Sequence, residues 1–194
     1  MTVHEPTTLG VLDLRAWARP IDLVEREVLS GLAGPVLEVG CGPGRLVAAL
    51  AEAGIPALGI DISPLAAELA AERGAPMLAR SVFEQLPHEG RWSTVLLIDG
   101  SIGIGGDPTA LLRRVRRVLA PGGLAVVEVK GPGIGLARGT AHVACDAAGH
   151  EMIPWAELGV DHLDEVAANA GFTLERGRRF GRRWFSWLRS TAYS

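Results

Sequence analysis

The sequence predicts a doubly wound α/β fold, with helices on both faces of a mostly parallel, seven-stranded sheet. Short apolar runs alternate with helix-like segments along most of the chain, which is typical of parallel strands joined by right-handed helical crossovers. The runs are apolar at nearly every position, as in strands that are buried on both faces. A glycine-rich stretch, residues 40–44, directly follows the first run, where such sheets place a ligand loop.

The first half of the chain contains two strand–helix units with clear boundaries. Gly54 ends the first of these helices, while Ser63 is an N-cap with Pro64 at the first helical position of the second. In order, the pattern predicts a helix over 14–29 interrupted near Pro20, a strand over 36–39, a helix over 46–53, a strand over 57–60 and a helix from Pro64 to Gly74.

The second half continues the alternation and then loses it. Asp107 and Pro108 cap an amphipathic helix, and residues 120–123 form the turn before a continuous apolar strand. The predicted elements are strands over 77–79, 94–98 and 124–129, a helix starting at residue 108, a glycine-rich irregular segment over 131–155, a helix over 160–170, and closing strands over 172–174 and 184–188.

The composition, with 48% hydrophobic and 21% charged residues, is typical of a globular protein, and we expect a single domain over residues 1–194. No apolar run approaches the roughly 20 residues of a membrane helix, and the opening stretch does not resemble a signal peptide. We therefore expect a cytoplasmic monomer or homodimer without membrane contact. Cys41 and Cys145 are too few for a disulfide framework, and no Cys or His spacing predicts a metal site. The expected parts are an N-terminal cap helix region over 1–30, a cofactor-binding core over 35–129, a variable substrate-side segment over 130–158, and a C-terminal helix with closing strands over 159–194.

The pattern E-x-G-x-G-x-G over residues 38–44 carries the functional signal. The dehydrogenase fingerprint G-x-G-x-x-G has its third glycine one residue later, so a nicotinamide cofactor is not predicted. The pattern resembles motif I of class I S-adenosylmethionine-dependent methyltransferases, and residues 59–63 and 119–124 resemble two further motifs of that family in the same order. The resemblance implies a methyltransferase with S-adenosylmethionine as cofactor, S-adenosylhomocysteine as product, and an antiparallel last strand.

Asp61 closes the second strand, where one carboxylate can accept hydrogen bonds from both hydroxyls of a ribose. Glu38 lies among apolar neighbours and either reaches the methionine end of the cofactor or orders the loop. The family usually has an acid after the third strand, but Ser81 and Val82 stand there, so we expect adenine to be held by backbone groups, Ser81 and the packing of Phe83. The predicted cofactor-binding residues are Glu38, Gly40, Cys41, Gly42, Gly44, Asp61, Ile62, Ser81, Val82, Phe83, Asp99, Gly100 and Ser101.

The glycine-rich loop over 98–107 follows the fourth strand, and we expect it to line both the methionine moiety and the methyl acceptor. Asp99 either orients an acceptor hydroxyl or amine, contacts the cofactor ammonium, or is a turn-forming aspartate. In-line methyl transfer can proceed by orientation alone, without a base. If a base exists, the candidates are His142 and His150, which are otherwise surface histidines. The catalytic candidates are thus Asp99, His142 and His150.

Three functions fit these observations. Methylation of oxygen or nitrogen on a small molecule ranks first, because little chain remains outside the core to hold a large acceptor. RNA or protein methylation ranks second, since the net charge of −3 does not favour a nucleic-acid partner, although the arginines over 176–183 either hold a phosphate or form a solvated turn. A non-catalytic S-adenosylmethionine-binding module is the third.

Trp17 and Trp155 either form the wall of an acceptor pocket or fill the core, and Arg15 or Arg19 is a candidate to bind the cofactor carboxylate.

Overall fold

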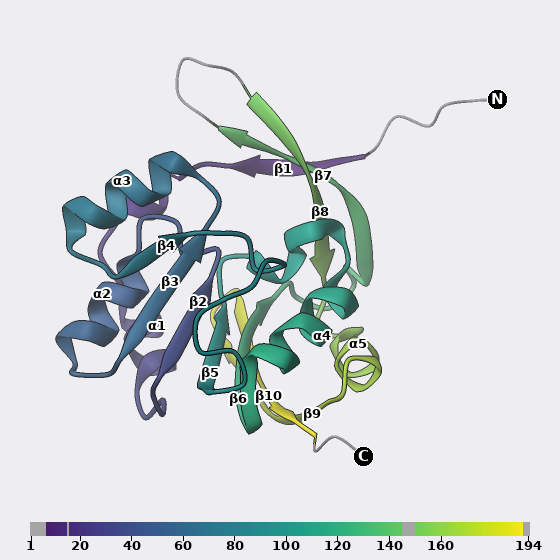
Figure 1. Ribbon diagram of the computed structural model, residues 1–194. Helices are drawn as coiled ribbons and strands as arrows, with labels where there is room; N and C mark the ends of the chain where they lie inside the picture. The colour runs from purple at the N-terminus through teal and green to yellow at the C-terminus, as the bar shows by residue number, and fades with distance from the viewer. Residues whose placement is uncertain (1–6, 15, 145–149, 192–194) are drawn as a thin grey trace.

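The computed structural model describes residues 7–14, 16–144 and 150–191, and its central feature is a seven-stranded sheet (Figure 1). Its last strand, β10, runs antiparallel to both of its neighbours, while the other strands run parallel to one another. The predicted doubly wound α/β sheet is therefore confirmed. In spatial order the strands are β4 (Met77–Ala79), β3 (Ala57–Asp61), β2 (Val36–Val39), β5 (Trp92–Leu97), β6 (Leu119–Val129), β10 (Arg183–Ser190) and β9 (Phe172–Phe180).

Helices cover both faces of this sheet because alternate side chains of each strand point to opposite faces. Leu37 and Val39 pack in the core cluster that contains the buried residues of α4 and α5, whereas Val36 packs with those of α1 and α2. The helices are α1 (Leu23–Leu29), α2 (Arg45–Glu52), α3 (Pro64–Arg73), α4 (Pro108–Val118) and α5 (Leu163–Asn169), with short 3-10 helices η1 (Ala16–Ala18) and η2 (Ser101–Gly106).

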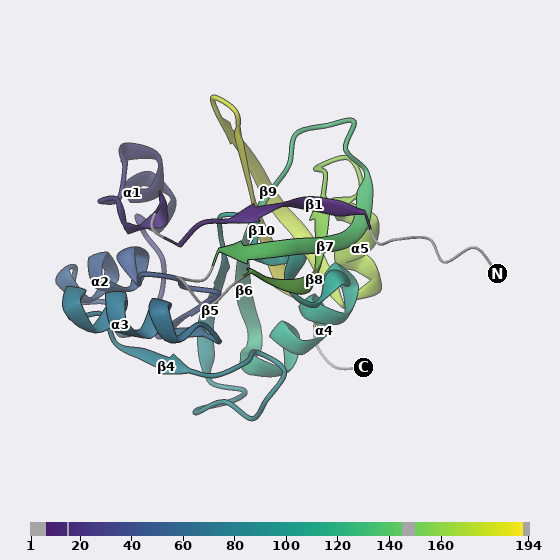
Figure 2. The ribbon, with the colours of Figure 1, turned by 90° about the horizontal axis from the view of Figure 1, so that it is seen from above.

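A second, three-stranded sheet lies across the carboxyl ends of the central strands. It consists of β1 (Thr8–Leu12), β7 (Leu136–Ala144) and β8 (His150–Leu158), in that order, with β1 parallel to β7 and β8 antiparallel to it. Figure 1 shows this sheet above the central one, and the view from above in Figure 2 shows it crossing over β5 and β6. The prediction of an irregular segment over 131–155 is therefore wrong. Hydrogen bonds to β1 and between β7 and β8 order residues whose sequence does not alternate as an isolated strand does.

The N-terminal region also differs from its prediction. The expected helix over 14–29 begins only at Leu23, where Asp22 and Glu25 form a capping box. Pro20 separates this helix from η1, because the residue before a proline disfavours the helical conformation. The predicted caps at Ser63 and Asp107 are confirmed, since both side chains accept hydrogen bonds from the first turn of the following helix. Within the described residues, no helix combines the length and the apolar character needed to cross a membrane.

Candidate functional site

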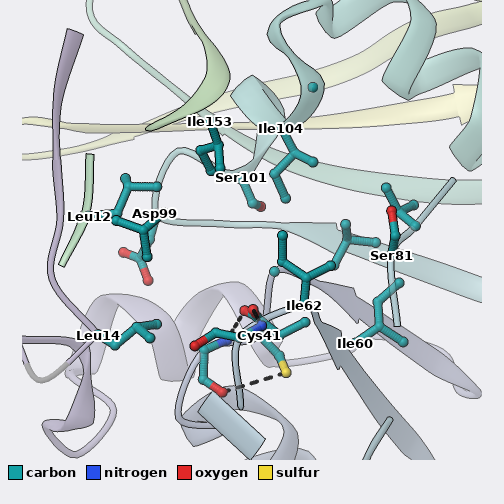
Figure 3. Close-up of a pocket in the computed structure, with 18 of the residues that line it drawn as sticks. Leu12, Leu14, Cys41, Ile60, Ile62, Ser81, Asp99, Ser101, Ile104 and Ile153 are labelled. Atoms are coloured by element: carbon teal, nitrogen blue, oxygen red, sulfur yellow. Dashed lines mark hydrogen bonds between the residues drawn. The ribbon is translucent and has the colours of Figure 1, made fainter. Parts of the chain in front are cut away.

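A cavity of about 330 Å³, here named the first cavity, opens between the carboxyl ends of β2, β3, β4 and β5 and the second sheet. Parallel sheets bind ligands at this edge, and the volume is within the range of small-molecule sites. Figure 3 shows Asp99 and Ser101 on one side of this cavity and Cys41, in the glycine loop, on the opposite side. Most of the predicted cofactor residues line it, namely Gly40, Cys41, Gly42, Asp61, Ile62, Ser81, Val82, Phe83, Asp99 and Ser101.

The glycine loop after β2 needs residues without a side chain for two different reasons. Gly40, Gly42 and Gly44 all have positive φ angles, of 67°, 50° and 70°. A Cβ atom on Gly40 would lie 2.9 Å from Cδ1 of Ile104, so Gly40 lets the loop approach the wall formed by η2. A Cβ atom on Gly44 would lie 2.7 Å from Cβ of Ala75. Gly44 therefore packs against the end of α3 and is not among the residues that line the first cavity, so the geometry assigns it a packing role and does not place it at the predicted cofactor contact.

Asp61 connects the glycine loop to the rim of the first cavity. Its Oδ2 accepts a hydrogen bond of 2.9 Å from the N–H of Gly42, and its Oδ1 accepts one of 2.9 Å from the N–H of Ser63. Each carboxylate oxygen can accept a further bond, so the side chain can hold the loop and still receive a ligand hydroxyl. Ile62 and Phe83 are 61% and 50% exposed, and these apolar side chains line the same cavity. The rim thus combines one carboxylate with apolar surface that a flat ring can cover.

Ser81 and Val82 follow β4 without an acid at either position, as the sequence indicates, and the acid nearest to them in sequence, Glu84, already accepts a 2.8 Å hydrogen bond from the N–H of Ser81. The hydroxyl of Ser81 accepts a 3.3 Å hydrogen bond from the N–H of Phe83, and the carbonyl of Val82 accepts one of 2.7 Å from Nε of Arg114. Val82 is buried and contributes an apolar wall. Recognition of a ring at this position must therefore rest on packing and backbone groups more than on a charged side chain.

Glu38 lies beneath the loop and is not among the residues that line the first cavity. Its side chain is 4% exposed, and Oε2 has no hydrogen-bond partner. Burial raises the pKa of Glu38 to about 8, against the opposing charge of Arg45, so the carboxyl group is mostly protonated at neutral pH. Of the two roles predicted for Glu38, the geometry favours support of the loop over direct contact with a ligand.

A cluster of charged side chains that the sequence did not predict lies beside the first cavity. Arg45, the first residue of α2, has a side chain only 2% exposed and donates to Oε1 of Glu25 at 2.6 Å and to Oδ2 of Asp99. Arg183, the first residue of β10, reaches Glu25 at 3.2 Å and holds both oxygens of Glu128 at 2.8 and 2.9 Å. These contacts join α1, α2 and the ends of β5, β6 and β10, so they hold the cavity wall in place.

The charges of this cluster stabilise one another against the cost of burial. Burial alone raises the pKa of Glu25, but hydrogen bonds from Arg19 and Arg45 outweigh it and bring the pKa to about 2. Burial also raises the pKa of Asp99, and here Arg45 and Arg183 oppose the effect without cancelling it. Arg19 is bound in a bidentate pair with Glu25, at 2.7 and 2.9 Å, and does not line the first cavity, so the geometry does not support its candidate role with a cofactor carboxylate. Arg15 lies outside the described residues.

Asp99 lies at the junction between the first cavity and a second cavity of about 410 Å³. Its φ angle is +55°, which turns the chain sharply after β5 and aims the side chain at this junction. Gly100 lines the second cavity only, so its prediction as a cofactor contact is not supported. The hydroxyl of Ser101 is buried in the wall of the first cavity without a hydrogen-bond partner, which leaves it available to a ligand.

Neither predicted histidine has a described side chain in a cavity wall. Val143 on β7 lines the first cavity, and the adjacent His142 is absent from both walls because successive strand residues face opposite sides. The backbone of His150 begins β8, but its side chain lies outside the described residues.

Trp17 and Trp155, in contrast to the histidines, line both cavities, which favours the pocket alternative for these tryptophans. The buried thiol of Cys41 has a raised pKa and is a filler of the loop rather than a nucleophile. The described chain contains no group of three or more His, Cys, Asp or Glu side chains that could hold a metal.

Comparison with solved structures shows the same fold in several methyltransferases. The chain superposes with a TM-score of 0.72 on an S-adenosylmethionine-dependent methyltransferase from Bacteroides fragilis in complex with S-adenosyl-L-homocysteine, at 21% identity over 91% of this chain and 81% of that one. The 1,6-didemethyltoxoflavin-N1-methyltransferase of Burkholderia thailandensis gives a TM-score of 0.62 at 22% identity, over 92% and 78% of the two chains. These identities establish a shared fold.

Sequence comparison assigns the family. The uncharacterized proteins Rv2003c of Mycobacterium tuberculosis and Mb2026c of Mycobacterium bovis are 33% identical to this chain over 144 residues, which cover 72% of the chain and 42% of each relative. The chain thus spans less than half the length of these curated relatives. A family model described as a methyltransferase domain matches residues 14–176, a stretch that includes the glycine loop, Asp61 and Asp99. The chain therefore belongs to the methyltransferase domain family and has the class I fold of S-adenosylmethionine-dependent methyltransferases.

Proposed function

We propose that this chain transfers a methyl group from S-adenosylmethionine to oxygen or nitrogen of a small-molecule acceptor and releases S-adenosylhomocysteine. The observation that carries the proposal is the first cavity, in which the glycine loop and Asp61 meet at the carboxyl ends of β2 and β3. A ribose beside Asp61 would donate both hydroxyls to one carboxylate. The family of the chain and the S-adenosylhomocysteine in its structural neighbours support this cofactor.

The rest of the cofactor follows from the chemistry of the walls. Adenine covers Ile62 and Phe83, because their exposed apolar surface gains most from burial under a flat ring. The methionine moiety extends along the glycine loop toward Ser101, whose buried hydroxyl lacks a partner, and toward Asp99. With the methionine moiety in this direction, the sulfonium would lie near the junction of the two cavities. Asp99, with its oxygens held by Arg45 and Arg183, supplies negative charge there without moving.

Transfer is an in-line displacement in which orientation supplies much of the rate. A lone pair of the acceptor oxygen or nitrogen forms the new bond to the methyl carbon. The pair of the breaking carbon–sulfur bond returns to sulfur, which becomes the neutral thioether of S-adenosylhomocysteine. The acceptor's proton leaves to water. No histidine is needed for this sequence of events, in agreement with the position of His142 away from both cavity walls.

The decisive experiment is a calorimetric titration of the wild-type chain and Asp61→Ala with S-adenosylmethionine, S-adenosylhomocysteine and NAD. Loss of charge-assisted hydrogen bonds to the ribose should weaken binding of both sulfur nucleosides by roughly tenfold to a hundredfold. Asp164→Ala, which removes an exposed carboxylate from α5, is the matched control and should bind as the wild type does. Equal affinity of Asp61→Ala and the wild type would remove Asp61 from the site, and binding of NAD alone would overturn the proposal.

Because Asp61 also accepts the N–H of Gly42, its loss can disturb the loop as well as the contact. Asp61→Asn separates the two effects, since the amide oxygen can still accept one backbone hydrogen bond. If the urea midpoint of Asp61→Asn matches that of the wild type while its affinity falls, the carboxylate acts on the ligand. A midpoint and an affinity that fall together would assign Asp61 to loop structure instead.

A further inference from the structure

The second cavity lies beyond Asp99, under the three-stranded sheet. Its walls come from β1 and β8 above and from the ends of β5 and β6 below. It shares Leu12, Trp17, Asp99 and Trp155 with the first cavity, so the two spaces adjoin along these side chains. A molecule in the second cavity can therefore reach a group bound in the first along this shared wall, which includes Asp99.

The walls of the second cavity favour a ring. Trp17 and Trp155 present two indole surfaces, and Leu9, Ile102 and Leu158 add aliphatic ones. Aromatic pairs contribute stabilisation beyond the burial of area alone. At about 410 Å³ the cavity is of a size for a compound of one or two rings and is too small for a macromolecule to enter whole.

The charged side chains of this wall are almost all occupied by one another. Asp99 and Glu128 are held by Arg45 and Arg183, as described above. Glu157 pairs with Nζ of Lys130 at 3.2 Å. The exception is Arg182, in the turn between β9 and β10, which is exposed and lines the cavity. Within the described residues it forms no hydrogen bond, ion pair or ring contact.

The neighbouring arginines of this hairpin, in contrast to Arg182, have partners. Arg176, Arg178 and Arg179 stack over Trp187, Phe180 and Trp184 at 4.0, 4.5 and 5.3 Å. Their charges are thus placed on rings of the same hairpin and not in a cavity. Arg182 alone among them lines the second cavity, and a guanidinium without a partner matches the two-oxygen geometry of a carboxylate or phosphate.

We propose that the second cavity holds the methyl acceptor, and that the acceptor is an aromatic compound whose carboxylate or phosphate group is bound by Arg182. The ring lies between Trp17 and Trp155, and the nucleophilic oxygen or nitrogen faces the Asp99 junction. This inference rests on the proposed function, because it needs the sulfonium in the first cavity. It adds to that function the charge of the acceptor and the end by which the acceptor is held.

The test uses three small probes that share one ring and one amine: 4-aminobenzoate, 4-aminophenyl phosphate and the neutral 4-aminobenzamide. Each is titrated calorimetrically into the chain saturated with S-adenosylhomocysteine. The wild type should bind at least one of the two anions about tenfold more tightly than the amide, as a charge-assisted hydrogen bond provides. Whichever of the benzoate and the phosphate binds more tightly shows which of the two anionic groups the site prefers. The preference should decrease at high salt because Arg182 is exposed.

Two variants decide whether Arg182 is responsible. Arg182→Gln should abolish the preference for the anions and leave the affinity for 4-aminobenzamide unchanged. Arg176→Gln removes an arginine of the same hairpin that lies outside both cavity walls, and it should keep the preference. An amide bound as tightly as both anions, or a preference that survives Arg182→Gln, overturns the inference. If S-adenosylhomocysteine binds in that case, the proposed function stands, whereas failure of S-adenosylhomocysteine to bind removes both proposals.

Discussion

Replacement of Arg45 by methionine tests whether the charge cluster holds the cavity wall together. Methionine keeps the length and apolar stem of the side chain, but it removes the contacts to Glu25 and Asp99. The side chains of Arg45 and Glu25 are 2% and 1% exposed, so solvent cannot replace the lost partner. Breaking a buried ion pair on one side typically costs about 3–5 kcal/mol, because the remaining charge stays buried.

The structure places the expected loss at the lower end of that range. Glu25 keeps Arg19 at 2.7 Å and Arg183 at 3.2 Å, and Asp99 keeps Arg183 at 3.5 Å. We therefore expect Arg45→Met to lower the free energy of unfolding by about 3 kcal/mol. Urea denaturation followed by tryptophan fluorescence measures this loss as a shift in midpoint at constant slope.

Arg178→Met is the matched control, because its 2.7 Å pair with Glu27 is 54% and 49% exposed and should contribute about 0–1 kcal/mol. If Arg45→Met lost no more than Arg178→Met, the cluster would not stabilise the wall. The double variant Glu25→Gln and Arg45→Met extends the argument. Its loss should be smaller than the sum of the two single losses, since the second change removes the charge that the first leaves unpaired.

Three further predictions concern other parts of the structure. Because the pKa of Glu38 is raised to about 8, the folded chain keeps a proton that the unfolded chain releases, and the wild type loses stability as pH rises from about 4.5 to 8. Glu38→Gln does not titrate, so its free energy of unfolding should rise relative to that of the wild type over this range. Urea titrations should show a relative gain of at most roughly 1.4 kcal/mol per pH unit. The pKa of Glu25 is lowered to about 2, so its effect on stability is the opposite: the ionised carboxylate stabilises the fold above about pH 4.5, and this stabilisation is lost toward pH 2. Between pH 4.5 and 2, the free energy of unfolding should therefore fall less in Glu25→Gln than in the wild type. A Cβ atom on Gly103 would lie 2.1 Å from the carbonyl of Ala156, so Gly103→Ala should lower the melting temperature by several degrees, whereas Gly10→Ala, with nothing within 4 Å, should leave it nearly unchanged.

The central sheet could be predicted from sequence because each strand carries its own signal. β2 and β4 have the predicted bounds, since a run such as Val36–Val39 is apolar except at Glu38 and lies between a proline and a glycine. β9 extends well beyond the predicted residues 172–174. Only the first residue of this strand is buried, and the polar residues that follow are ordered by their pairing with β10. Local hydrophobicity does not report such pairing.

The second sheet is not predicted from the sequence for the same reason. β7 contains Arg138, Gly139 and Thr140 in a row and has no run of apolar residues. Gly139 is required there because a Cβ atom would lie 2.0 Å from the carbonyl of Thr7, in a segment more than a hundred residues away along the chain. The requirement for this glycine comes from a residue that is distant in the sequence. Without the folded structure, the glycine therefore resembles a loop residue.

Residues of the site were predictable where a motif marks them and not where tertiary contacts do. The roles of Asp61 and the glycine loop could be predicted from their positions in the strand–helix units, and both line the first cavity. No motif marks Arg45, and its one signal in the sequence is that it is the only basic residue of the otherwise largely apolar α2, which indicates a buried partner. Its partners Glu25 and Asp99 are far apart in the sequence, so the cluster becomes evident only in the folded chain.

The pairing of β1 with β7 also determines the order in which the site can be assembled. During synthesis β1 leaves the ribosome before the strands of the central sheet, yet its described strand partner β7, in which Thr140 pairs with Thr8, follows only after β2 to β6 have been made. Contacts this distant in sequence form late, because a long loop must first be closed. Leu12, Leu14 and Trp17 thus complete the first cavity after its floor of glycine loop and Asp61. A nascent chain that has already formed the floor still cannot enclose its ligand until β7 has emerged.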